Sequence, residues 1–77
     1  VAKGVSIIIE NLLSDKDGVV RASAARESGN LTKLDKDMLN RISSKLSNML
    51  NDPSPIAASN AKEALEKLKS LRKSIIN

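Results

Sequence analysis

Apolar residues recur at helical spacing in four stretches of the chain, and short polar segments separate these stretches. Apolar positions three and four residues apart are typical of amphipathic helices. The stretches predict helices over residues 2–13, 18–30, 35–51 and 55–74. The β-branched run in the first stretch would also suit a strand, but no partner strand is predicted elsewhere. We therefore expect an all-α fold of four antiparallel helices in a single domain, residues 1–77.

The same spacing predicts which face of each helix is buried. The expected inner positions are Val5, Ile8, Ile9, Leu12 and Leu13 in the first helix, Val20, Ala24, Ser28 and Leu31 in the second, Met38, Leu39, Ile42, Leu46, Met49 and Leu50 in the third, and Ala57, Ala61, Ala64, Leu65, Leu68, Leu71 and Ile75 in the last. Because the chain contains no Phe, Trp or Tyr, aliphatic side chains and alanine must form this core. Small residues at 22–25 allow another helix to approach the second helix closely.

Capping residues mark the ends of the predicted helices. Asp17 is expected to cap the second helix, with its carboxylate accepting from backbone N–H groups of the first turn. Thr32 and Asp35 offer a variant of the capping box at the start of the third helix. Pro53 ends that helix, because the residue before a proline is disfavoured in the α region. Ser54 is then the predicted cap of the fourth helix.

Matching residues recur at a fixed interval along the chain. The members of each pair lie 37 positions apart: Leu13 and Leu50, Asp15 and Asp52, Val19 and Ile56, Ala24 and Ala61, Leu31 and Leu68. A constant period of this length is typical of stacked helical repeats. We therefore expect two stacked helical hairpins, with one repeat at about residues 2–31 and the other at about 35–74.

These residues resemble the HEAT-repeat family, and the short HEAT-like type most closely. The first unit carries the resemblance in Leu13, Asp15, Val19, Arg21, Ala24 and Leu31. HEAT repeats typically have an Asp in the turn and an Arg six positions later, as in Asp15 and Arg21, and these residues help to form a hydrogen-bonded ladder between neighbouring turns. In the second unit Asp52 matches the turn, but Ala58 stands at the Arg position. The resemblance therefore implies an α-solenoid fragment with a partial ladder, in which Asp52 reaches back to Arg21.

The composition argues against catalysis and metal binding. The chain has no His and no Cys, which removes imidazole and thiolate ligands and the usual general base. Residues 15–18, Asp-Lys-Asp-Gly, resemble part of a calcium loop, but the first and last ligands in that register would be Leu13 and Ala24. The glycosylation triplet at residues 30–32 is attributed to a helix end followed by a helix start. We expect a non-catalytic protein with no cofactor.

The first helix presents more apolar surface than one neighbouring helix can cover. At about 100° per residue, Ile7, Ile8 and Ile9 span a wide arc of the helix. Two hairpins are also fewer than the roughly three repeats that usually give a stable stack. We therefore predict an interaction or assembly module that binds itself or another protein through Ile7, Ile8 and Ile9, together with the C-terminal pair Ile75 and Ile76.

The excess of positive charge suggests an alternative partner. The net charge is +4, and most of the excess falls in residues 62–77. The candidate basic face consists of Arg26, Lys62, Lys69, Arg72 and Lys73. Contact of these residues with duplex phosphates is the alternative function, whereas base stacking is excluded because the chain lacks aromatic residues. No apolar run reaches the ~20 residues that span a membrane, and we expect a cytoplasmic protein. A third possibility is that the chain is one piece of a longer solenoid.

Overall fold

The computed structural model describes residues 3–76 of the chain, with the side chains of residues 4–73. The described residues form four α-helices and one 3-10 turn, and they contain no strand. The elements are α1 (Lys3–Leu12), α2 (Gly18–Gly29), α3 (Lys36–Asn48), η1 (Met49–Asn51) and α4 (Pro55–Ile76). The predicted all-α fold is confirmed.

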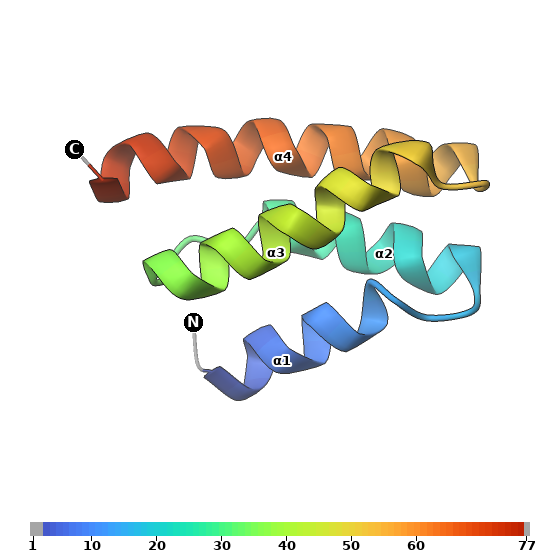
Figure 1. The fold of residues 1–77 in the computed structure, drawn as a ribbon, viewed down its shortest axis with the longest axis horizontal. Helices are drawn as coiled ribbons and strands as arrows, with labels where there is room; N and C mark the ends of the chain where they lie inside the picture. Colours follow the sequence, from blue (N-terminus) through green and yellow to red (C-terminus); the bar gives the residue numbers. More distant parts are fainter. Residues whose placement is uncertain (1–2, 77) are drawn as a thin grey trace.

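Successive helices run antiparallel and form two helical hairpins (Figure 1). The first hairpin consists of α1 and α2, and the second consists of α3 and α4. The hairpins stack so that α1 lies beside α3 and α2 lies beside α4. The stack measures 35 × 23 × 16 Å. Each hairpin therefore has one face against the other hairpin and one face turned away from it.

The helices begin at side-chain caps. The Asp17 carboxylate accepts a hydrogen bond from the Val19 backbone N–H at 2.8 Å, and the Ser54 hydroxyl accepts one from the Ala57 N–H at 3.3 Å, as predicted. The capping box at Thr32 is wrong. Asp35 is itself the N-cap of α3, where its carboxylate accepts from the Met38 N–H at 2.8 Å. The helix begins after Asp35, so Thr32 lies outside its first turn.

Small residues let α2 and α4 pack closely. Ala25 of α2 and Ala61 of α4 are both fully buried. A Cβ atom on Gly29 would lie 3.0 Å from the Cα of Ala64, so glycine suits this crossing. Larger aliphatic side chains from α1, α3, η1, α4 and the connecting segments complete one core cluster that runs through both hairpins. The largest of them with complete burial are Leu39, Ile42, Leu46 and Leu68.

The buried face of α1 differs from the predicted one. Ile9 and Leu13 are buried as expected, but Val5, Ile8 and Leu12 are exposed. Polar residues take the remaining inner positions, Ser6 and Glu10. The helix is rotated from the orientation that hydrophobicity alone favours, and its inner face carries the Glu10 carboxylate, which forms an ion pair with Arg41 of α3.

Leu50 is also placed differently from its prediction. It is 45% exposed, whereas Leu46 is fully buried. In an α-helix these residues would share a face, but η1 has three residues per turn and rotates Leu50 away from it. Leu50 and Leu13 therefore correspond in the 37-residue period but differ in burial, since Leu13 is buried and Leu50 is exposed.

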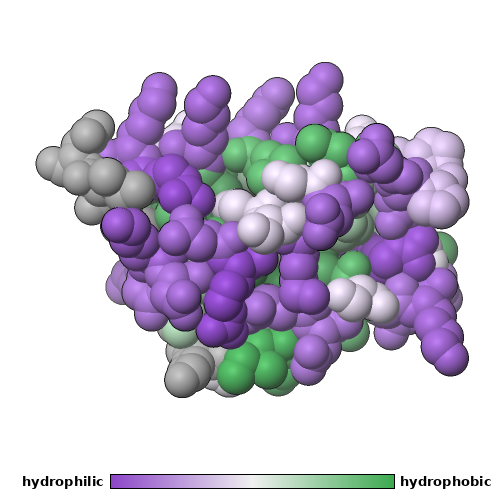
Figure 2. All heavy atoms as spheres, in the orientation of Figure 1, coloured by the Kyte–Doolittle hydropathy of each residue, from purple (hydrophilic) through white to green (hydrophobic). Residues whose placement is uncertain are grey.

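Figure 2 shows the surface of the stack, with apolar side chains at the edge formed by α1 and polar ones projecting along the edge formed by α4.

Candidate functional site

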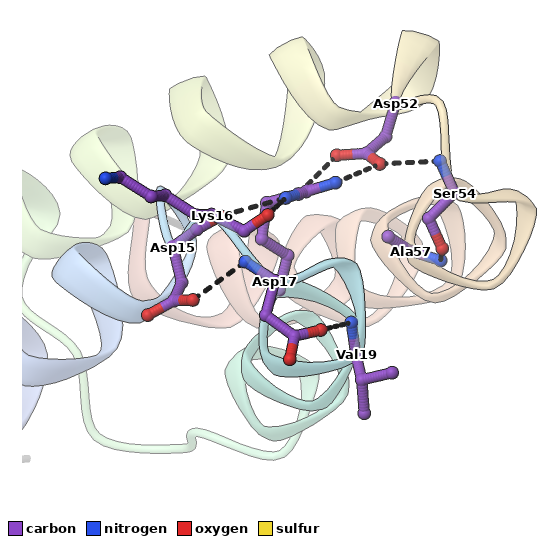
Figure 3. Close-up of polar contacts among 8 residues, drawn as sticks. Asp15, Lys16, Asp17, Val19, Asp52, Ser54 and Ala57 are labelled. Carbon is purple, nitrogen blue, oxygen red and sulfur yellow. Dashed lines mark hydrogen bonds and ion pairs between the residues drawn. The ribbon is translucent and has the colours of Figure 1, made fainter.

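A bidentate ion pair joins the turns of the two hairpins. Arg21 Nε donates to Asp52 Oδ2 at 2.8 Å, and Arg21 Nη2 donates to Asp52 Oδ1 at 2.9 Å (Figure 3). The third guanidinium nitrogen donates to the backbone carbonyls of Asp15 and Lys16 at 2.9 and 3.0 Å. The predicted contact between Arg21 and Asp52 is therefore present, and it ties the turn before α2 to the turn before α4.

Asp15 takes part in this arrangement through its backbone. Its carboxylate accepts a hydrogen bond from the Asp17 N–H at 2.9 Å, just as Asp52 accepts one from the Ser54 N–H at 2.8 Å. The two aspartates thus hold equivalent turns (Figure 3). The difference is that Asp52 also receives an arginine, while the Asp15 side chain has no arginine partner among the described contacts.

A second ion pair, between α1 and α3, was missed by sequence reasoning. Arg41 Nη2 lies 2.7 Å from Glu10 Oε2, and Arg41 Nε donates to Glu10 Oε1 at 3.1 Å. Asp37 also accepts from Arg41 at 3.1 Å. Glu10 and Arg41 are 31 positions apart, the same separation as Arg21 and Asp52. That shared separation is the sequence signal that could have found this ion pair.

The two carboxylates make stability depend on pH. The hydrogen bond from Arg41 lowers the pKa of Glu10 below its ordinary value of 4.5. The hydrogen bond from Arg21, with a smaller effect from the Ser54 N–H, lowers the pKa of Asp52 below 3.8. A lowered pKa in the folded state stabilises the fold while the group is ionised, because the unfolded chain binds protons more readily.

We therefore expect a constant melting temperature near neutral pH and a progressive fall below about pH 5, as these carboxylates become protonated. Thermal unfolding followed by far-UV circular dichroism from neutral pH to about pH 3 measures this effect. Glu10→Gln and Asp52→Asn should each lower the melting temperature at neutral pH and flatten part of the acid slope. An unchanged acid slope in both variants would contradict the assignment.

The outer face of the first hairpin carries an apolar groove between α1 and α2. Val5, Ile8 and Leu12 are 46%, 59% and 38% exposed, and their spacing places them along one side of α1. The groove has a volume of about 430 Å³. Val5 and Leu12 line it from α1, and Val20 and Glu27 are among its residues from α2. A sizeable apolar hollow thus remains uncovered on this hairpin.

The five isoleucines predicted as an interface have different positions. Ile8 is exposed on the same side of α1 as Val5 and Leu12, whereas Ile9 is only 8% exposed, belongs to the core and also lines the groove. Ile7 is 41% exposed and lies about 160° around the helix from Ile9, which lines the groove, so it points away from the groove. The side chains of Ile75 and Ile76 lie outside the described residues.

The predicted basic residues do not form one face. Lys62, Lys69 and Lys73 are exposed and lie along one side of α4 at intervals of seven and four residues. Arg26 belongs to α2 and lines a different hollow, between α2 and α4. Arg72 Nη1 donates to Asn40 Oδ1 of α3 at 2.8 Å. Three lysines remain together, and the two arginines are separated from them.

The described residues contain no group of three or more acidic, His or Cys side chains placed to hold a metal ion. None of the described helices combines the length and the apolar character needed to cross a membrane.

Comparison of the chain with protein-family models, curated protein sequences and solved structures found no match in any of the three. The function must therefore be argued from the geometry of this chain.

Proposed function

We propose that this chain is a non-catalytic assembly module of two HEAT-like repeats, which binds a protein through the outer face of its first hairpin. The observation that carries the proposal is the exposed apolar side of α1, formed by Val5, Ile8 and Leu12 next to a groove of about 430 Å³. Contiguous apolar surface of this kind in a small protein marks an interaction site. Scattered single apolar residues would not carry the same argument.

Three features support the HEAT-like part of the proposal. The pairs of matching residues keep a 37-residue period, the helices form stacked hairpins, and Arg21 binds Asp52 between neighbouring turns. A cytoplasmic location is compatible with the absence of cysteine.

Nucleic-acid binding is the weaker proposal. It now depends on Lys62, Lys69 and Lys73, because Arg26 and Arg72 lie apart from this side of α4. Glu66 is exposed on the same side of the helix, one turn after Lys62, and reduces its positive charge. We therefore favour a protein partner over a nucleic acid.

The proposal predicts weak self-association in the absence of a partner, because the uncovered apolar faces associate with one another. Sedimentation velocity from micromolar to millimolar concentration should show a rising mean mass for the wild-type chain. Ile8→Asn should keep the chain monomeric, since it places an amide beside the groove. Ile7→Asn is the matched control on the other side of α1 and should leave the association unchanged.

Two results would contradict this function. One is a wild-type chain that stays monomeric at millimolar concentration. The other is association that Ile7→Asn abolishes while Ile8→Asn leaves it intact, because the contact would then lie outside the proposed face.

A further inference from the structure

The groove of the first hairpin corresponds to a surface that is buried in the second hairpin. The 37-residue period relates Val5 to Ile42 and Leu12 to Met49. Val5 and Leu12 are 46% and 38% exposed. Ile42 and Met49 are 0% and 5% exposed, because the first hairpin stacks on that side of the second. Within the described residues, no hairpin lies on the same side of the first hairpin.

The first hairpin covers the second with two devices. One is a stripe of small residues along α2, in which a Cβ on Gly18 would lie 3.2 Å from Ser54 Cβ, and one on Gly29 would lie 3.0 Å from Ala64 Cα. The other is Arg21, whose guanidinium binds the Asp52 carboxylate in a bidentate manner. Close helix approach and one arginine thus define how a hairpin is recognised in this stack.

We propose that the groove between α1 and α2 receives a helical hairpin from another protein, which lays a small-residue helix against α2 and presents an arginine to Asp15. Asp15 is suited to this role because its turn has the same carboxylate-to-backbone hydrogen bond as the turn of Asp52. This inference rests on the proposed function and names the partner of that same face.

A second copy of this chain does not fit the groove in the same way. The 37-residue period relates the small positions 22, 25 and 29 of α2 to Ser59, Lys62 and Glu66 of α4, and it relates Arg21 to Ala58. The Lys62 and Glu66 side chains are too long for a close helix approach, and Ala58 rather than an arginine would stand opposite Asp15. The outer face of the second hairpin therefore lacks the two features with which the first hairpin covers the second.

The groove also selects details of its partner. Arg41 pairs with Glu10, but the residue that corresponds to Arg41 in the first hairpin is Gly4. The partner hairpin therefore needs no acid at the position equivalent to Glu10. Glu27 stands where the second hairpin has the buried Ala64, so the partner places a cation opposite Glu27.

A tandem protein tests the proposal with a hairpin of known sequence. A second copy of residues 1–37 is added ahead of Val1 of the full chain, which reproduces the 31-residue separation between the added Arg21 and the original Asp15. The added copy carries two substitutions. Glu10→Ala removes an acid that would find Gly4 of the original copy in place of an arginine, and Asn30→Lys places a cation opposite Glu27 of the original copy. The tether supplies a high effective concentration. Because the chain has no cysteine, Leu12→Cys in the original copy gives a single reporter in the groove.

We expect the Leu12→Cys thiol to be labelled at least about tenfold more slowly in the tandem protein than in the 77-residue chain, because labelling then requires the added hairpin to open. Ser59→Cys on α4 is the control and should be labelled equally fast in both proteins. Arg21→Gln in the added copy should restore part of the fast labelling. Asp15→Asn in the original copy should also restore part of the fast labelling in the tandem protein. In the 77-residue chain it should leave the labelling rate unchanged.

Equal labelling of Leu12→Cys in the two proteins would overturn the inference, whether or not the added segment is helical, since the groove would then not hold a hairpin. Slow labelling that neither Arg21→Gln nor Asp15→Asn accelerates would overturn the role of Asp15. Self-association that depends on Ile8 would leave the proposed function standing in either case, so the two failures are distinguishable.

Discussion

Replacing Leu46 by Ala should lower the free energy of unfolding by about 2–5 kcal/mol, because the side chain is fully buried and its removal leaves a cavity. A domain of 77 residues has a total stability of roughly 4–12 kcal/mol. The variant should therefore lose much of its stability, and urea unfolding followed by circular dichroism at 222 nm, the standard helical signal, measures the loss. Alanine also has the higher helix propensity, so the loss is attributed to the core.

Leu50→Ala is the matched control for that experiment. It removes the same atoms one helical turn later, where the side chain is 45% exposed in η1. We expect a change within about 0.5 kcal/mol, as for other surface substitutions. Equal losses in the two variants would mean that Leu50 also packs in the core, contrary to the rotation of η1.

Replacing Ala25 by Leu should also destabilise the fold, but by overpacking the contact between α2 and α4 rather than by leaving a cavity. Ala25 is fully buried there, and Gly29 one turn later has the Ala64 Cα within 3.0 Å of where a Cβ would lie. Extra methylenes in such a contact cost about 1–3 kcal/mol. The helices would have to separate, which would also strain the ion pair between Arg21 and Asp52. Thermal and urea unfolding give the loss.

Arg26→Leu is the control for overpacking. Arg26 follows Ala25 in the same helix but is exposed, so the added leucine meets no neighbouring backbone. We expect little change in stability from this variant. A stable Ala25→Leu protein with an unchanged melting temperature would show that α2 and α4 have room to spare at this crossing.

The local features of the fold were predictable because their causes are local. Asp17 caps α2 through a backbone N–H two residues away, and Ser54 caps α4 through one three residues away. The spacing of Ala57, Ala61 and Leu68 on α4 likewise requires only the helical period, and all three are buried. The contact between Arg21 and Asp52 came from the resemblance to HEAT repeats, in which the spacing of the turns sets the pairing.

The candidate site was less predictable, since it depends on which side of each helix meets its neighbour. The hydrophobic pattern predicts that Ile8 and Ile9 of α1 are both buried, but in the structure Ile9 is buried and Ile8 is exposed. The inner face of α1 instead includes Glu10, which pairs with Arg41 across 31 residues. The hydrophobic pattern gives no sign that Glu10 is turned inward, and only the 31-residue separation that this pair shares with Arg21 and Asp52 points to it.

The sequence by itself determined the number of helices, most of their ends, the 37-residue period and the small residues that allow α2 to approach α4. These properties follow from backbone hydrogen bonding and helical periodicity. Only the tertiary structure decided the rotation of α1, the exposure of Leu50 and the separation of Arg26 from the lysines of α4. The physical reason is that burial is a property of pairs of helices. The uncovered groove of the first hairpin is therefore visible only once the second hairpin shows what would cover it.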